Sequence, residues 1–325
     1  MTAFLLRRLR HSLALLMAIS VLSFALTELA PGDFFDQLRL DPRTSSETVD
    51  ALRIRYGLDR PLPVRYLRWI GSTVRGEMGY SFALNQPVSR VLWPRTRNTL
   101  LLTVTATLLA WLVALPLGIW VAARPRPWAR FVFGTGTSLI LAIPDLALGL
   151  LVMLLAARTG WFPIGGMRVA DWTGLGFLSQ LADVAHHMAL PVTALVLSIA
   201  PSLARHVQSS MAEVLASPFV QAVRGAGIPR RRLLWRYALP VAANPLISLL
   251  GFSFAGLLSA SLLIEIVVGW PGVGPLLLEA AEARDPYVVI GAVMISSLLL
   301  IAGNLAADLA LFWIDPRIHR QGEPG

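Results

Sequence analysis

The chain of 325 residues contains neither cysteine nor lysine, and only 14% of its residues are charged. Without cysteine it cannot form a disulfide, a thiolate zinc site or a cysteine nucleophile. Without lysine it cannot form the phosphate-binding loop in which a lysine reaches the phosphates of ATP. If ATP drives this protein, another subunit must therefore bind it.

Apolar residues dominate what is present. The chain is 55% hydrophobic with a mean hydropathy of +0.64, values typical of membrane proteins and not of soluble domains. All 28 basic residues are arginine, and the formal net charge is +9. In a membrane protein such an excess indicates topology rather than nucleic-acid binding.

Six nearly uncharged stretches are long enough to cross a bilayer, which requires about 20 residues. They are predicted at residues 12–30, 98–123, 131–157, 188–204, 241–268 and 287–311. The third stretch is interrupted by Pro144, which a membrane helix tolerates when neighbours satisfy the freed carbonyl. The first follows three arginines like a signal peptide, but residues 26–30 offer no small-x-small cleavage pattern, so we interpret it as a retained anchor.

The distribution of arginine predicts the orientation. Residues 1–11, 124–130, 205–240 and 312–325 together carry 14 arginines and three acids. The short segments on the other side, 158–187 and 269–286, carry three arginines between them. Positively charged loops stay in the cytoplasm, so both termini and the segment 205–240 are predicted to be cytoplasmic.

The outer region 31–97 is the longest segment between spans. Its residues 49–57 predict a short helix with a glycine stop, and residues 64–70 predict an amphipathic helix. The region has too few apolar residues for a core of its own. We therefore expect a cap that packs on the ends of the spans, in preference to a free domain.

A short polar helix is predicted at residues 217–227, between the fourth and fifth spans. Ser217 can cap it, Pro218 suits its first position, and Gly225 or Gly227 can end it. Its apolar face would consist of Phe219, Val220 and Val223. So short a helix needs support, which a partner protein would supply; the alternative is packing on its own chain.

The outer turn 269–286 is rich in glycine and proline and is predicted to be irregular. Its apolar residues should return it to the ends of the spans, with Glu279, Glu282 and Asp285 facing the rim. Glu265 lies just before this turn, and either a pathway or gate role or a structural role at the helix break is open for it. We name Glu265, Trp270, Pro271 and Gly272 as gate or pathway candidates.

No residues suggest catalysis or a bound cofactor. His186 and His187 are adjacent, and neighbouring side chains on a helix point about 100° apart, which suits chelation poorly. The sequence predicts neither a metal site nor a catalytic group, so the chain is expected not to be an enzyme.

A series of landmarks runs through the whole chain in a fixed order. They are residues 29–33, 57–63, 76–81, 98–100, 160–166, 217–227 with 237–240, 269–274 and 315–317. In this order the chain resembles the first permease subunit of dipeptide, oligopeptide and nickel ABC importers. The segment from Gln221 to Pro240 resembles the coupling-loop motif of these permeases, although it begins Gln-Ala-Val instead of Glu-Ala-Ala and has Ala226 before the motif glycine. Asp145 departs from the small hydroxyl residue that is usual there.

The resemblance implies an all-α integral membrane protein of six transmembrane helices, with the type I ABC importer architecture and an extracytoplasmic cap between helices 1 and 2. It also implies a homologous second permease, two cytoplasmic ATPase subunits or domains, and an extracytoplasmic substrate-binding protein in a bacterial inner membrane. The implied ATPase-coupling residues are Phe219, Gln221, Ala222, Arg224, Gly225 and Gly227. The implied substrate is a di- or oligopeptide, with nickel or another small solute as the alternative. An ion-coupled secondary transporter is a more distant alternative, since no coupling-ion site or inverted repeat is evident.

Overall fold

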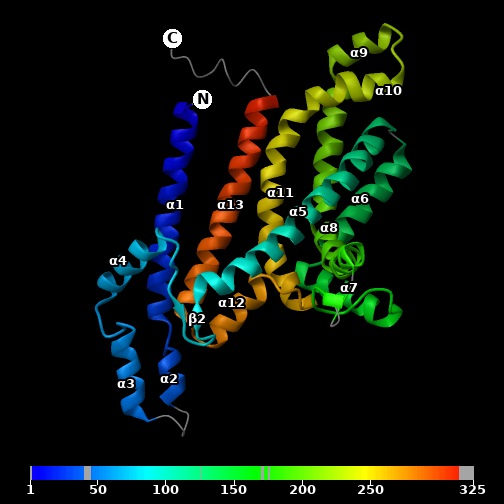
Figure 1. Cartoon of the computed structure of the whole chain (residues 1–325). Helices are drawn as coiled ribbons and strands as arrows, with labels where there is room; N and C mark the ends of the chain where they lie inside the picture. The colour runs from blue at the N-terminus through cyan, green and yellow to red at the C-terminus, as the bar shows by residue number, and fades with distance from the viewer. Residues whose placement is uncertain (1, 40–44, 125, 170–171, 175, 315–325) are drawn as a thin grey trace. The chain divides into compact units, whose positions relative to one another are not determined.

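The computed structural model describes residues 2–39, 45–124, 126–169, 172–174 and 176–314 (Figure 1). The predicted landmark at 315–317 and all but the first three residues of the segment 312–325 lie outside the described residues. Apart from turns and loops, the described part is helical except for one short antiparallel hairpin, in which Tyr80 pairs with Pro87 and Ser81 with Gln86. In chain order the elements are α1 (Thr2–Leu29), α2 (Phe34–Arg39), α3 (Ser46–Arg55), α4 (Leu62–Thr73), β1 (Tyr80–Ser81), β2 (Gln86–Pro87), α5 (Val88–Ala123), α6 (Pro127–Leu141), α7 (Asp145–Thr159), η1 (Trp172–Gly174), α8 (Phe177–Ala216), α9 (Pro218–Gly225), α10 (Arg230–Arg232), η2 (Leu233–Ala238), α11 (Leu239–Val268), α12 (Val273–Glu282) and α13 (Pro286–Ile314).

Five of the described helices are long and apolar enough to cross a membrane, and a bent pair makes a sixth if it counts as one span. The bent pair is α6 and α7, which meet at 98° within the stretch predicted as one span at 131–157. Pro144 explains the break, because it fixes its own φ, lacks an N–H and disfavours helical geometry at the residue before it. The predicted fourth span at 188–204 is the middle of α8, which continues beyond it in both directions.

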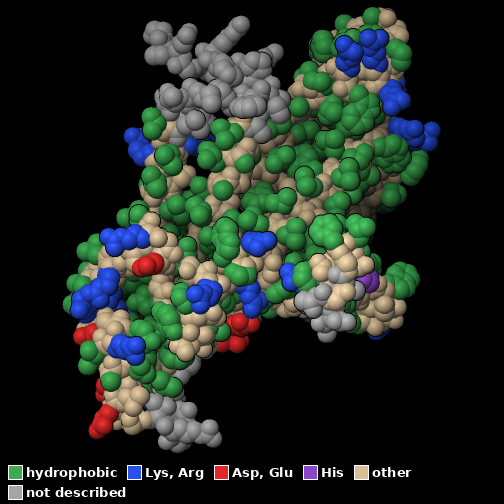
Figure 2. Space-filling view, in the orientation of Figure 1, with side chains coloured by type: hydrophobic (Ala, Val, Ile, Leu, Met, Phe, Trp, Pro, Cys, Tyr) green, Lys and Arg blue, Asp and Glu red, His purple; other side chains and the backbone are tan. Residues whose placement is uncertain are grey.

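The chain folds into two compact units, each with its own core. Unit 1 consists of residues 1–99 and 271–299, and unit 2 of residues 100–270 and 300–325. The helices α5 and α13 each contribute one part to each unit. Figure 2 shows hydrophobic side chains over the outer surface of the long helices, as expected where lipid replaces water.

The core of unit 1 joins the region 31–97 to two long helices. Phe24 of α1, Trp69 of α4 and Ile290 of α13 form one buried cluster. The indole N–H of Trp69 donates to the carbonyl of Met78 at 3.0 Å, so the tryptophan also fixes the chain that follows α4. The region 31–97 therefore shares a core with α1 and α13 and does not form one alone.

The core of unit 2 lies among α5, α7, α8 and α11, where thirteen buried residues from Leu102 to Trp270 form one apolar cluster. Small residues let the helices approach closely, as in many membrane bundles. A Cβ added to Gly118 of α5 would lie 2.7 Å from the carbonyl oxygen of Ala204 on α8. A Cβ added to Gly303 of α13 would lie 2.2 Å from the ring of Phe254 on α11. An added side chain would thus force the backbone to shift at Gly118 and the ring of Phe254 to shift at Gly303.

Candidate functional site

The helix α9 has the caps that its sequence predicts. The Ser217 hydroxyl accepts a hydrogen bond from the Val220 N–H at 3.4 Å and donates to the carbonyl of Val214 at 2.7 Å. Pro218 is its first residue. Gly227, with φ of 72°, supplies the left-handed residue after its end, whereas Gly225 belongs to the helix. The capping prediction is confirmed, and Gly227 is the glycine that performs it.

The three residues of the predicted apolar face of α9 differ in burial. Val220 is fully buried and α9 contacts α8 and η2, so Val220 anchors the helix to its own chain. Phe219, in contrast, is 51% exposed. Adjacent side chains on a helix point about 100° apart, so Phe219 can be exposed while Val220 is buried. The helix is therefore supported by its own chain, and the need for external support is no longer an argument for a partner.

The six predicted coupling residues lie together on the exposed part of this helix and its glycine stop. Phe219, Gln221, Ala222, Arg224, Gly225 and Gly227 are all exposed. They present one aromatic ring and one guanidinium beside small residues that allow close approach. Such a surface suits a groove on another protein, in which an exposed ring fills a pocket and the guanidinium pairs with a carboxylate.

In unit 2, α11 ends at a break that contains two of the gate candidates. Gly269 has φ of 70° and ends the helix, and the N–H of Trp270 turns back to the carbonyl of Glu265 at 2.9 Å. The N–H of Gly166, in the outer loop, donates to the carbonyl of Gly269 at 3.1 Å. The side chains of Glu265 and Trp270 are both fully buried. A carboxylate this deep in unit 2 is enclosed by protein and not by lipid.

In unit 1, the other two gate candidates lead into a helix that the sequence did not predict. Residues 273–282 of the supposedly irregular turn form α12. Gly274 and Pro275 lie in its first turn, where a missing N–H costs nothing because those groups have no partner within the helix. The apolar residues Val273 and Leu276 are buried, as predicted. The prediction of an irregular turn over the whole of 269–286 is wrong.

Two neighbouring residues of α5 fix the start of α12. The side-chain amide of Asn98 donates to the carbonyl of Pro271 at 2.7 Å. The Thr99 hydroxyl accepts from the N–H of Val273 at 2.9 Å, which satisfies a donor at the helix start. Pro271 and Gly272 are thus held between α5 and α12 by side chains far away in the sequence.

Asp285, at the other end of α12, was predicted to face the outer rim, and this is wrong. It is fully buried. Its Oδ2 accepts from the Ser81 hydroxyl at 2.7 Å and from the Ala83 N–H at 3.1 Å. Burial of a charge is tolerated when it accepts hydrogen bonds, and here they come from the hairpin. Glu279 and Glu282 are exposed, as predicted.

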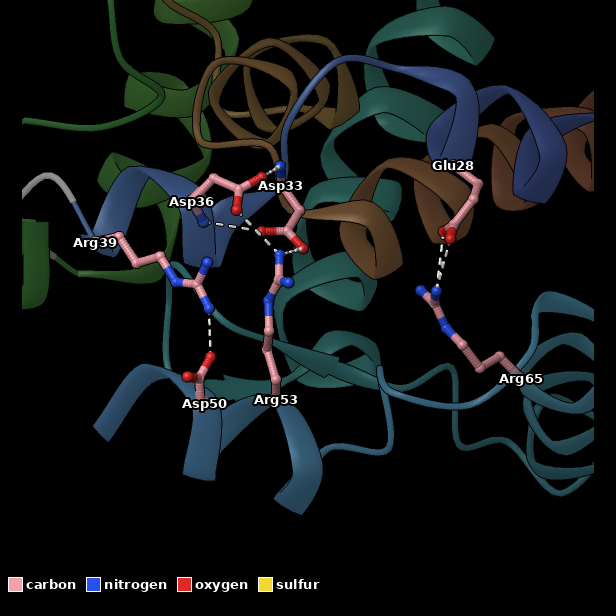
Figure 3. Close-up of polar contacts among 7 residues, drawn as sticks. All are labelled: Glu28, Asp33, Asp36, Arg39, Asp50, Arg53 and Arg65. Atoms are coloured by element: carbon pink, nitrogen blue, oxygen red, sulfur yellow. Dashed lines mark hydrogen bonds and ion pairs between the residues drawn. The ribbon is translucent and has the colours of Figure 1, made fainter. Parts of the chain in front are cut away.

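Ion pairs join the helices of the region 31–97, as Figure 3 shows. Arg53 of α3 donates to Asp33 and, at 3.1 Å, to Asp36 of α2, and Arg39 pairs with Asp50. The hydrogen bond to Asp33 raises the pKa of the Arg53 guanidinium above its ordinary value, against a smaller lowering by burial. These pairs use two of the eleven arginines and three of the seven acids of residues 31–97.

A separate pair, Arg65 of α4 with Glu28 of α1, is also drawn in Figure 3. The same guanidinium nitrogen lies 3.0 and 2.9 Å from the two carboxylate oxygens of Glu28. Glu28 therefore has a structural role, tying the end of the first long helix to α4.

Polar contacts also tie both arms of the bent pair to α8. Arg205 donates to the Thr137 hydroxyl at 2.7 Å and to the carbonyl of Gly134 at 2.9 Å, both on α6. Ser198, two turns earlier on α8, donates to Asp145 at the start of α7. Asp145 is also placed where a helix N-terminus favours a negative charge. It therefore has a structural partner that the sequence did not suggest.

Sequence reasoning missed the contacts of Asn98, Thr99, Ser81 and Arg205. The first three lie in landmark segments, but a sequence landmark does not show which residues its side chains contact. Arg205 directly follows the predicted fourth span and was counted as a loop charge. Its place on a continuous membrane helix is the signal that could have identified it, since such charges usually have a partner.

The histidine pair forms two separate contacts. The Nδ1 of His187 lies 2.9 Å from the carbonyl of Asp183 and 3.3 Å from its carboxylate, while His186 contacts the carbonyl of Trp161 at 2.9 Å. Within the described residues, no three side chains of His, Asp or Glu come close enough to hold a metal ion.

Comparison with known proteins gives consistent matches along the chain. The family model described as "Binding-protein-dependent transport system inner membrane component" matches residues 114–320, and the corresponding N-terminal model matches residues 1–103. The oligopeptide transport system permease protein AppB of Bacillus subtilis is 35% identical over 98% of this chain and 100% of its own length. The probable D,D-dipeptide transport system permease protein DdpB of Escherichia coli is 33% identical over 94% of each chain. A solved inward-facing structure of the MetNI methionine ABC transporter covers 69% of this chain and 96% of the matched chain, with a TM-score of 0.55 and 18% identity.

Proposed function

Because the chain belongs to the family of binding-protein-dependent transport system inner membrane components, we propose that it forms, with a homologous permease, the pathway of an importer for di- or oligopeptides. It is a permease subunit of an ABC importer and not an enzyme, and ATP hydrolysis belongs to separate subunits.

The peptide substrate is supported by the names of the relatives. Proteins that match nearly the whole chain are named permeases for oligopeptides and for D,D-dipeptides. Nickel and other small solutes are the alternatives that the sequence left open. The methionine transporter shares the fold at 18% identity, which carries no argument about substrate.

The observation that carries the proposal is the exposed surface of α9. Ser217 and Gly227 cap it, and with Val220 buried it packs on α8 and on η2, the turn that leads into α11. A displacement of α9 by an ATPase would therefore reach α8 directly and α11 through η2. A partner can shift the two states of a pathway only if it binds them differently, and this surface provides the place for that difference.

On the outer side, we propose that α12 and the region 31–97 dock the substrate-binding protein. Exposed Glu279 and Glu282 would face it, while the contacts of Asn98, Thr99 and Ser81 hold the surface in shape. This assignment requires both termini to be cytoplasmic and the protein to lie in the inner membrane.

Site-specific crosslinking tests the coupling surface, and the absence of native cysteine makes it clean. Single cysteines at Phe219, Gln221 and Arg224 should crosslink to the ATPase subunits in the assembled importer. The matched control is a cysteine at Val220, which is buried in the same helix and should not react. Equal labelling at all four positions, or none at the three exposed ones, would contradict the proposal.

Substrate class requires a separate measurement. Proteoliposomes that contain the whole importer and receive its binding protein outside should accumulate labelled di- or oligopeptide only with ATP inside. Uptake of nickel without uptake of any peptide would keep the permease assignment and overturn the substrate.

A further inference from the structure

The segment that follows the coupling helix carries an arginine-lined groove. A cavity of about 700 Å³ is bordered by Pro229, Arg231, Arg232, Trp235 and Arg236. The three arginines are exposed, and the tryptophan is 50% exposed. In Figure 2 basic side chains gather at the end of unit 2 that carries α9 and α10. Nothing in the proposed coupling or docking roles uses this groove.

A π-helical turn creates its geometry. Here α10 runs into η2, whose hydrogen bonds join residues five apart, as from the N–H of Leu239 to the carbonyl of Leu234. Residues five apart in such a turn lie on the same side. Arg236 and Trp235 of this turn border the groove together with Arg231 and Arg232, which precede the turn.

The same spacing fixes the inner side of the turn. Leu233 and Ala238 are also five residues apart, and both are buried. Ala238 packs with Val207 and Met211 of α8. The π turn thus separates an apolar inner side, which packs on α8, from a basic outer side. The arginines of the outer side stay exposed.

The positive charge of this groove is uncompensated within the described chain. Glu213 is the single acid in the segment 205–240. None of the ion pairs between described residues includes an arginine of 230–236. Four guanidinium groups within seven residues repel one another, and an external anion would relieve that repulsion.

The distance between Arg236 and the apolar stretch of the fifth span indicates which kind of anion binds the groove. Arg236 precedes the predicted fifth span at 241–268 by five residues, which is about 7.5 Å at the helical rise of 1.5 Å per residue. The headgroup layer extends roughly 5–8 Å beyond the hydrocarbon core. Arginine beside a tryptophan at this depth is typical of a membrane interface, where basic clusters attract anionic lipids.

We propose that this groove binds the phosphate of an anionic phospholipid headgroup. The planar guanidinium donates two parallel hydrogen bonds to phosphate oxygens, and Arg231, Arg232 and Arg236 surround one side of the groove. The ring of Trp235 lies against the glycerol backbone of the lipid. The site anchors the start of α11 to the bilayer, next to the helix that an ATPase would displace.

Native mass spectrometry of the full-length chain tests this, with dioleoylphosphatidylglycerol and dioleoylphosphatidylcholine titrated separately. The native chain should retain the anionic lipid more tightly. The variant R231Q/R232Q/R236Q should lose affinity for it by about fivefold for each arginine and reach the affinity for the zwitterionic lipid. The variant R124Q/R126Q/R130Q removes the same charge from another loop and should stay close to the native affinity.

Other outcomes would overturn the proposal. Equal retention of both lipids by the native chain would exclude a headgroup site. If both triple variants lose the same affinity for the anionic lipid, the effect depends on net charge and not on this groove. Full competition by inorganic phosphate, or tight binding of a short oligonucleotide that the first variant alone abolishes, would reassign the groove to another anion. If the glutamine variant fails to fold, R231K/R232K/R236K keeps the charge and should still weaken retention, because lysine lacks the planar fork.

Discussion

The Ser81 hydroxyl donates a 2.7 Å hydrogen bond to the buried carboxylate of Asp285, 204 positions later in the chain. The contact joins the hairpin of the region 31–97 to the end of α12, within unit 1. If the Ser81 donor is removed, the Asp285 carboxylate stays buried and loses part of the hydrogen bonding that offsets its desolvation. Loss of this one bond should therefore lower the free energy of unfolding by more than loss of a hydrogen bond between neutral groups.

Replacement of Ser81 by alanine should lower the stability of the protein by about 1.5–3 kcal/mol, the usual range for a hydrogen bond to a charged group. The measurement is the apparent melting temperature in detergent. Ser72 provides the control, because its hydroxyl bonds only to the carbonyl of Trp69 in its own helix. If Ser81→Ala and Ser72→Ala melt at the same temperature, the contact with Asp285 does not stabilise the outer region.

This contact also shows what the sequence could predict and what it could not. The caps of α9 were predictable because Ser217, Pro218 and Gly227 act within one turn of the residues they cap. The helix α12 was not, because its glycines and prolines favour a turn and its start is fixed by Asn98 and Thr99 from a distant segment.

The angle between α6 and α7 and the burial of Asp285 could not be predicted either, because both depend on residues far away in the sequence. Pro144 predicts a break in the helix. The 98° angle between α6 and α7 depends in addition on where Arg205 and Ser198 of α8 bind these two helices. The burial of Asp285 likewise depends on a hairpin far away in the chain. Features set by neighbouring residues, such as helix caps, could therefore be predicted from the sequence. Contacts between residues far apart in the sequence could not.

Replacement of Gly227 by valine should uncouple ATP hydrolysis from uptake. At a φ of 72° a β-branched residue is strained by about 1–2 kcal/mol, and no atom lies within 4 Å of the added Cβ, so the effect is purely conformational. The measurement is the ratio of transported substrate to hydrolysed ATP in proteoliposomes. Gly136 of α6 is equally open but has no positive φ and lies outside the coupling surface, so Gly136→Val is the control and should couple normally. Normal coupling by Gly227→Val would contradict a role for this stop.

Replacement of Gly118 by alanine should destabilise unit 2. The added Cβ would lie 2.7 Å from the backbone oxygen of Ala204 and from the side chain of Val207, so α5 and α8 must move apart. Overpacking of this kind costs about 1–3 kcal/mol. Gly136 of α6 has nothing within 4 Å of an added Cβ, so Gly136→Ala should melt like the native protein. Equal melting temperatures for the two variants would show that this crossing adapts.

The arginine distribution predicts the orientation, and reporter fusions test it. An enzyme that is active only outside the cytoplasm should be active when fused after residues 60 or 278 and inactive after residues 127 or 225. The control is a reporter with the opposite requirement at the same four positions. Activity of the first reporter at residue 225 would place α9 outside and overturn the orientation and the coupling proposal together.

The outer gate gives the last prediction, and Asn98 is its most direct probe. Its side-chain amide donates to the carbonyl of Pro271 at 2.7 Å, whereas Trp270 is so completely buried that its removal would unsettle the fold itself. Asn98→Leu keeps the size of the side chain and removes the donor. We expect uptake to fall about tenfold, because a loss of roughly 1.4 kcal/mol in the positioning of 271–273 corresponds to that factor. Co-purification with the ATPase subunits should be unchanged, and Asn98→Gln, which keeps the amide, should retain part of the uptake. If Asn98→Leu transports at the native rate, the break at 269–272 does not form the outer gate, whatever its contacts.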